Sequence, residues 1–194
     1  MKRGRRLPRF HTGRYGAAMT SPGRRPLLFL DVDGPLIPFG ATARELPNGY
    51  PAYGTQPDPN PLLARLDPAL GSRLLALPCD LVWATTWMAD ANAWVGPRIG
   101  LPDLPVVSWP DPSEQDDRDR THWKTRALVD HAAGRPFAWV DDEITPADRS
   151  WVRAHHPAPA LLHRVDARFG LTPADFTTLA AWLRGHTFPQ EVTA

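Results

Sequence analysis

Cysteine and long apolar runs are what this sequence of 194 residues has least of. Its single cysteine, Cys79, excludes a disulfide within the chain and a metal site built from cysteines alone, so nothing argues for an oxidising compartment. No apolar run approaches the roughly 20 residues that a helix needs to span a bilayer. The basic N-terminus also lacks the apolar segment of a secretory signal. We therefore expect a cytoplasmic protein that has no membrane partner.

Acidic residues are absent from the first 25 positions, which carry eight basic ones. These are Lys2, Arg3, Arg5, Arg6, Arg9, Arg14, Arg24 and Arg25. Removing these eight charges from the formal net charge of +1 leaves −7 on residues 26–194. We expect 1–25 to be a disordered basic tail and 26–194 to be a single domain. A basic arm that binds nucleic acid is the alternative, to which the acidic remainder gives no support.

Short apolar runs alternate with helical patterns along the rest of the chain. The runs predict strands at 27–30, 81–84, 106–109, 137–140 and 161–165. The patterns predict helices at 62–77, 88–95, 121–133, 146–155 and 173–184, with a long loop over 35–61. This alternation is typical of a parallel sheet that helices cover on both faces. The sequence therefore predicts an α/β fold, a Rossmann-like, doubly wound parallel sheet of about five strands.

The strongest chemical signal is Asp31-Val32-Asp33-Gly34, which follows the first predicted strand directly. Carboxylates at positions i and i+2 of an extended segment point to the same face, and Gly34 allows a sharp turn close to a ligand. Like charges held this close together need a cation or a shared proton. Other polar residues end predicted strands or begin a helix, places that converge on one crevice in a doubly wound fold. They are Thr85, Thr86, Lys124, Asp141 and Asp142.

The order of these residues matches the four motifs of the haloacid dehalogenase-like (HAD) phosphohydrolases. The segments LFLDVDG, LVWATTW, WKT and FAWVDDE resemble the HAD domain of Swiss-army-knife RNA repair proteins. The resemblance extends from Leu27 to about Arg184. It implies an HAD-like fold and a phosphatase that works through an aspartyl-phosphate intermediate.

The resemblance also implies roles for the acidic residues. Asp31 is expected to be the nucleophile, and Asp33 the general acid that later serves as general base. Mg²⁺ is expected to be held by Asp31, the backbone carbonyl of Asp33 and Asp141, with Asp142 binding directly or through water. Mg²⁺ prefers such oxygen ligands.

Phosphate binding is assigned to three kinds of group. Either Thr85 or Thr86 is expected to bind the phosphoryl oxygens, because the motif can be aligned in two registers here. Lys124 is expected to neutralise charge on the nucleophile and on the transferring phosphoryl group. Gly34 is expected to bring the backbone close to the phosphate.

The substrate is inferred from the size of the insertions. The two places where HAD proteins carry a cap domain hold 27 residues (35–61) and 37 residues (87–123), too few for an independent domain. A capless or minimally capped crevice favours a phosphate that is exposed on a larger molecule, such as a nucleic-acid end. Trp87 and Trp123 are candidate substrate contacts because they adjoin the predicted site. We expect a monomer, since no oligomerisation stripe is evident.

Three other interpretations remain. Pro35 replaces the Thr or Val that usually follows the motif, so a catalytically weak HAD module that binds or scaffolds in a repair or defence system is the main alternative. A phosphorylatable receiver domain would place its lysine after the last acidic pair, whereas Lys124 precedes it. A metal nuclease built on the carboxylates alone would leave Thr85 and Lys124 without a role.

The repeated Thr-Pro-Ala-Asp segments are interpreted as helix caps, with Asp148 and Asp175 as the capping acids.

Overall fold

The computed structural model describes residues 25–54, 60–110 and 120–187. The predicted basic tail over 1–25 therefore lies outside the described residues, except for Arg25, and the division into a tail and one domain stays a prediction. None of the helices in the described ranges is long and apolar enough to cross a membrane.

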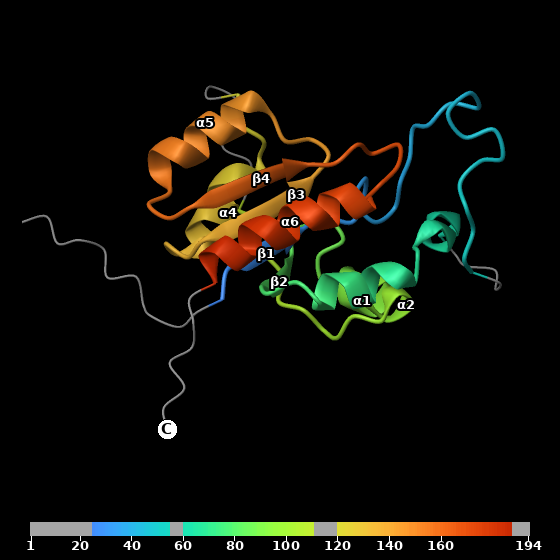
Figure 1. The fold of residues 1–194 in the computed structure, drawn as a ribbon, viewed down its shortest axis with the longest axis horizontal. Coiled ribbons are helices and arrows are strands. Elements are labelled where there is room, and N and C mark those ends of the chain that lie inside the picture. Colours follow the sequence, from blue (N-terminus) through green and yellow to red (C-terminus); the bar gives the residue numbers. More distant parts are fainter. Residues whose placement is uncertain (1–24, 55–59, 111–119, 188–194) are drawn as a thin grey trace, which may run out of the picture.

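The centre of the fold is a sheet of four parallel strands in the order β2-β1-β3-β4 (Figure 1). The strands are β1 (Leu27–Leu30), β2 (Asp80–Trp83), β3 (Phe137–Asp141) and β4 (Ala160–Arg164). They form where the sequence has short apolar runs, because a strand buried on both faces needs apolar side chains on both. The predicted α/β class and parallel sheet are confirmed.

The third strand predicted along the chain, at 106–109, does not form a strand. Val106 makes a single parallel bridge with Trp83, next to the two backbone hydrogen bonds from Trp83 N to Pro105 O and from Val107 N to Trp83 O. Prolines on both sides, Pro105 and Pro110, lack the N–H donors that would extend the pairing. The run is apolar as predicted, but the prolines on either side prevent the repeated backbone pairing that a strand needs.

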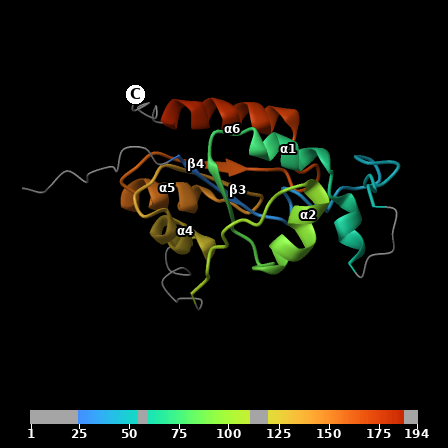
Figure 2. The same ribbon diagram turned by 90° about the horizontal axis from the view of Figure 1, so that it is seen from below.

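Helical segments connect the strands and lie on both faces of the sheet. They are η1 (Pro61–Arg65), α1 (Ala69–Leu75), η2 (Ala91–Val95), α2 (Gly96–Ile99), α4 (Lys124–Ala132), α5 (Pro146–His155) and α6 (Pro173–His186). Figure 2 shows α1 and α6 on one side of the sheet and α4 and α5 on the other. Because neighbouring residues of a strand point to opposite faces, Leu28 packs in the core beneath α1 and α6, and Phe29 in the core beneath α4 and α5.

Three predicted helices differ from the structure. The pattern over 62–77 forms the short 3₁₀ segment η1 and then α1, separated at Asp67-Pro68, since proline disfavours helical geometry in the preceding residue. The helix predicted over 88–95 is a π-helical turn, η2, continued by α2. The start of α4 is Lys124 rather than residue 121. The lysine therefore lies on the first turn of its helix.

Candidate active site

The ends of β1 and β3 bring three carboxylates together. The parallel register pairs Leu30 with Val140, and Asp31 N donates to Val140 O at 3.1 Å, so Asp31 lies beside the end of β3. Carboxylate oxygens of Asp31, Asp141 and Asp142 lie within 4.8 Å of one another. Asp31 and Asp141 are buried and Asp142 is half-buried. Like charges packed this closely require a positive counter-charge.

Lys124 supplies one such charge from the first turn of α4. Its ammonium Nζ donates to Asp31 Oδ2 at 2.7 Å and to Asp141 Oδ2 at 2.9 Å. The side chain is only 3% exposed, which excludes the ordinary role of a lysine at the surface. The Nζ atom also lies 5.5 Å from the centre of the Trp123 ring. Lysine, as a compact point charge, can contact both carboxylates at once.

The remaining bonds of Asp141 fix its position. Trp139 donates from Nε1 to Asp141 Oδ2 at 3.2 Å, and the N–H of Glu143 donates to Asp141 Oδ1 at 2.9 Å. Trp139 is also in the core, so its indole has both a packing role and a polar role. The sequence pattern indicated only the packing role.

Burial of this cluster changes its protonation equilibria. Burial, together with the nearby charge of Asp141, raises the pKa of Asp31 to about 7, although the Lys124 ammonium lowers it. Burial and Asp141 also raise the pKa of Asp142. Burial alone would lower the pKa of Lys124, but the attraction of Asp31 and Asp141 raises it above its ordinary value. The site therefore holds more negative charge than one ammonium balances, and a bound cation would favour the ionised form of Asp31.

Asp33 lies outside the cluster of three carboxylates. Its side chain is half-buried, and Trp87 donates from Nε1 to Asp33 Oδ2 at 2.9 Å. Trp87 therefore orients Asp33, and its predicted contact with substrate stays a prediction. The two residues are 54 positions apart in the sequence, so no local pattern could predict this bond.

Gly34 is required for the close packing of the site loop. Its φ of +83° is one that other residues rarely adopt, and a Cβ there would lie 2.4 Å from Asp142 Oδ1. Its own N–H donates to Ile37 O at 3.0 Å, within the turn. Gly34 thus allows the loop to approach Asp142, while its predicted contact with phosphate stays a prediction.

The two threonines after β2 have different surroundings. Thr85 is fully buried, and its Oγ1 accepts the Trp87 N–H at 3.3 Å, while Thr86 is exposed. The backbone N–H of Ala84 donates to Leu30 O, so both threonines follow the point where β2 and β1 end side by side. The assignment of phosphate binding to Thr85 or Thr86 stays a prediction.

Asp148 connects the starts of α4 and α5. It closes the capping box of α5, accepting from Thr145 N at 2.7 Å and Thr145 Oγ1 at 2.6 Å. Its other oxygen accepts from His122 N and from Thr125 Oγ1, each at 2.6 Å. Hydrogen bonds to the ionised form outweigh burial and lower the pKa of Asp148. The predicted cap is confirmed, and Asp148 additionally fixes the residues on both sides of Lys124.

His122 completes the attachment of this turn. The Lys124 N–H donates to His122 Nδ1 at 3.2 Å, so in the neutral ring Nε2 carries the proton and donates to Glu143 Oε2 at 2.9 Å. Ligand atoms of His122, Glu143 and Asp141 also lie within 4.8 Å of one another. Since both ring nitrogens are already engaged, we interpret His122 as a structural residue rather than a metal ligand.

Comparison with known proteins bears on this site. The sequence model of one protein family, described as the HAD domain in Swiss Army Knife RNA repair proteins, matches residues 27–176. The match runs from β1 to the first turn of α6 and includes every predicted site residue. It confirms the resemblance drawn from the sequence segments. Searches among curated proteins and among solved structures found no match.

Proposed function

Because the chain belongs to the family of HAD domains in Swiss Army Knife RNA repair proteins, we propose that it is a Mg²⁺-dependent phosphatase that removes a terminal phosphate from a nucleic acid. At a coarse level, the family places the chain among hydrolases of the phosphatase type. The observation that carries the finer proposal is the buried Lys124 ammonium, which bonds both Asp31 and Asp141 where β1 and β3 end.

The donor set at this place fits Mg²⁺. The acidic group of Asp31, Asp141 and Asp142 offers only carboxylate oxygens, the hard ligands that Mg²⁺ prefers. These three residues would hold the ion, with the backbone carbonyl of Asp33 as the further ligand that the family implies. When bound, the ion supplies positive charge that lets a dianionic phosphate approach the carboxylates.

The first chemical step belongs to Asp31 and Asp33. Two hydrogen bonds, from Val32 N and Lys124 Nζ, occupy the Asp31 carboxylate, which keeps further lone pairs for attack. An Asp31 oxygen forms a bond to phosphorus as the bond from phosphorus to the ester oxygen breaks. Asp33 gives its proton to the departing oxygen, and Lys124 stabilises the charge that develops on the phosphoryl group.

The second step restores the enzyme. The Asp33 carboxylate removes a proton from water, whose oxygen attacks phosphorus while the bond from phosphorus to Asp31 breaks. Inorganic phosphate leaves, Asp31 is again a carboxylate, and Asp33 has regained the proton that it lost in the first step. Trp87 holds Asp33 in place for both transfers.

The open edge of the site supports a large substrate. Within the described residues, the segment between β1 and α1 forms only η1 and irregular loop, and the segment between β2 and α4 forms only η2 and α2. In the parts of these two segments that the structure describes, neither forms a domain that could enclose a small metabolite. We therefore propose the end of a nucleic acid as the substrate, in line with the RNA repair proteins that give the family its description.

Removal of divalent metal tests the proposed function. We expect turnover of a generic aryl phosphate by the full chain to stop in excess chelator and to return on addition of Mg²⁺. An Asp142→Asn variant should need more Mg²⁺ for half-maximal rate, because it loses one charged ligand. Turnover that chelator leaves unchanged would contradict the proposal. Binding of phosphorylated RNA without any turnover would favour the alternative of a binding module.

Trp87→Phe tests the role of Asp33 in leaving-group protonation. The substitution keeps an aromatic ring but removes the N–H that orients Asp33. We expect kcat to fall roughly fivefold for an alkyl phosphate, whose leaving oxygen needs a proton, because one hydrogen bond is lost. The decrease should be smaller for an aryl phosphate with an acidic leaving group. Equal losses for both substrates would contradict the role, and Trp94→Phe provides the control.

Asp148→Asn, compared with Asp175→Asn, tests whether Asp148 positions Lys124. Both acids occupy the same place in a Thr-Pro-Ala-Asp capping box, but only Asp148 also bonds the residues around Lys124. Asp175 also pairs with His163 Nε2 at 2.8 Å. We expect Asp175→Asn, which weakens the cap and this half-buried pair, to lower the free energy of unfolding by about 1 kcal/mol. Asp148→Asn should lower it by about 2–3 kcal/mol, because a buried network loses its charged acceptor.

Turnover separates positioning from stability in this pair. At a temperature where both variants are folded, kcat should fall on the order of tenfold in Asp148→Asn and stay unchanged in Asp175→Asn. A tenfold decrease corresponds to a loss of roughly 1.4 kcal/mol in the stabilisation of the transition state by the charge of Lys124. Equal rates in the two variants would limit Asp148 to capping. Urea unfolding and initial rates on an aryl phosphate give both quantities.

A further inference from the structure

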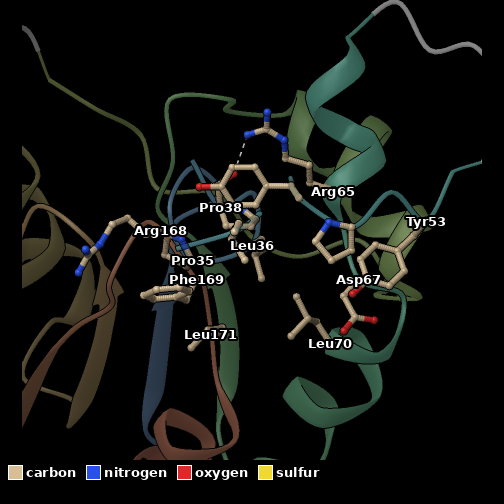
Figure 3. Close-up of a pocket in the computed structure, with 14 residues that line it drawn as sticks. Pro35, Leu36, Pro38, Tyr53, Arg65, Asp67, Leu70, Arg168, Phe169 and Leu171 are labelled. Carbon is tan, nitrogen blue, oxygen red and sulfur yellow. Dashed lines mark hydrogen bonds between the residues drawn. The ribbon is translucent and has the colours of Figure 1, made fainter. Parts of the chain in front are cut away.

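A pocket of about 220 Å³ opens beside the loop that carries the site (Figure 3). Its distinctive lining residues are Pro35, Tyr50, Tyr53, Arg65, Asp67 and Phe169. Figure 3 shows Phe169 on one side of the pocket and Tyr53 with Asp67 on the other. Nothing in the proposed chemistry uses these side chains.

The walls combine aromatic rings with fixed arginines. The guanidinium of Arg65 lies 4.3 Å from the centre of the Tyr50 ring and donates to Pro38 O at 2.8 Å. Tyr50 is held in turn by the Ala41 N–H, which donates to its hydroxyl at 2.7 Å. Both side chains are therefore already positioned for a flat ligand.

The opposite wall has the same construction. The Arg168 guanidinium lies 5.4 Å from the centre of the Phe169 ring, and Asp166 and Glu45 both pair with Arg168. The rings of Phe169 and Tyr53 are nonetheless 48% and 45% exposed. Large aromatic surfaces left open next to a pocket commonly mark a binding site.

The pocket adjoins the proposed phosphate site. Pro35 lines it and directly follows Gly34, which packs against Asp142. Arg168 borders this pocket and also a second hollow, whose other residues include Asp142 and Arg164. The two hollows thus meet at Arg168, and the second hollow reaches Asp142, one of the three clustered carboxylates.

Pro35 contributes to this arrangement. Its carbonyl accepts the Leu171 N–H at 2.9 Å, and a Cβ on Gly170 would lie 3.0 Å from the same oxygen. Pro35 therefore ties the site loop to the segment that carries Phe169. The residue that departs from the usual motif forms part of the pocket wall.

We propose that this pocket binds the nucleobase of the nucleotide whose phosphate enters the site, an inference that rests on the proposed phosphatase function. A nucleobase offers two flat faces and an edge with donors and acceptors. The rings of Tyr53 and Phe169 supply stacking surfaces. Arg65 and Arg168 supply donors and Asp67 an acceptor, whereas Asp67 would repel a second phosphate.

Binding to an inactive variant tests the pocket apart from turnover. In the Asp31→Asn full chain, we would measure the Kd of short single-stranded RNAs phosphorylated at the 5′ or the 3′ end, by fluorescence anisotropy. Each is compared with an RNA of the same sequence whose phosphorylated terminal nucleotide lacks its base. At one of the two ends, the intact RNA should bind about 5- to 150-fold more tightly, as stacking of one base provides.

The added variants Tyr53→Ala and Phe169→Ala should each bring that ratio close to one. Trp94→Ala is the matched control, because Trp94 is also exposed and has Arg98 beside it at 5.6 Å, but does not line the pocket. Thermal unfolding verifies that all variants are folded.

The inference is overturned if removal of the base does not weaken binding at either end, or if Tyr53→Ala and Phe169→Ala keep the preference. Selective binding of a phosphopeptide through these rings, with RNA binding insensitive to them, would overturn it as well. Binding is measured in Asp31→Asn and does not depend on turnover. If that variant prefers the intact base but the unmodified chain shows no phosphatase activity, the proposed function is refuted and the base pocket is not.

Discussion

Asp31→Asn is expected to reduce turnover of an aryl phosphate by at least about 10³-fold, because the substitution removes the nucleophile on which both steps depend. Asparagine has nearly the shape of aspartate, so the packing beside Val140 and the contact with Lys124 can be kept. The loss should appear in kcat, since no other group can form the covalent intermediate. Initial rates at saturating substrate and Mg²⁺ measure it.

Controls distinguish this loss from damage to the fold. Asp90→Asn removes an exposed carboxylate that precedes η2 and should leave the rate unchanged. The midpoint of urea unfolding should show that Asp31→Asn is folded under the assay conditions. A variant that is folded and retains most of its turnover would refute Asp31 as the nucleophile.

Lys124→Met is expected to destabilise the protein and to abolish turnover. Methionine preserves much of the apolar volume, but Asp31 and Asp141 lose the ammonium that bonds both of them in a buried place. Removing one partner of a buried ion pair costs about 3–5 kcal/mol in the free energy of unfolding. Urea unfolding in the presence of chelator measures this loss.

Two further experiments distinguish the effect of the positive charge at position 124 from the effect of its geometry: adding Mg²⁺ to Lys124→Met, and replacing Lys124 with arginine. Addition of Mg²⁺ should restore part of the stability of Lys124→Met, because a bound cation neutralises the same carboxylates. Lys124→Arg keeps the charge and should retain more stability, yet its planar guanidinium cannot reproduce the compact contacts of the ammonium, so turnover should remain low. If Lys124→Met is as stable as the wild type, the buried pair does not have the role assigned to it.

Lys124 illustrates what the sequence revealed about the site. The chain has two lysines, Lys2 and Lys124, among 22 lysine and arginine residues. Because nearly all other basic positions in this chain are arginine, a lysine between the two acidic motifs indicates that this position requires the compact charge of lysine. The acidic motifs could be located because strand ends in a parallel sheet share one edge, so sequence position alone fixes their neighbourhood.

Contacts between distant segments could not be predicted in this way. Thr145-Pro146-Ala147-Asp148 and Thr172-Pro173-Ala174-Asp175 are identical segments, yet only Asp148 reaches the turn before α4. That difference depends on which helix packs nearby, not on local sequence. The bond from Trp87 to Asp33 depends likewise on loop conformation.

The fold was predictable to the extent that local patterns decide it. Four of the apolar runs form strands because helices cover both faces of each. The run at 106–109 fails because its flanking prolines, which are local as well, prevent pairing beyond one bridge. The pocket beside Pro35 was not predictable, since it joins the loop before η1 to the loop after β4.

The central claim, covalent catalysis by Asp31, is tested most directly by trapping the intermediate. An Asp33→Asn variant should still be phosphorylated by an activated aryl phosphate but should hydrolyse the intermediate slowly, because it lacks the general base. After acid quench, peptide mass spectrometry is predicted to find one phosphoryl group on the peptide that contains Asp31, and none when Asp31 is also replaced by Asn. Phosphate release without any adduct, or an adduct on another residue, would contradict the account.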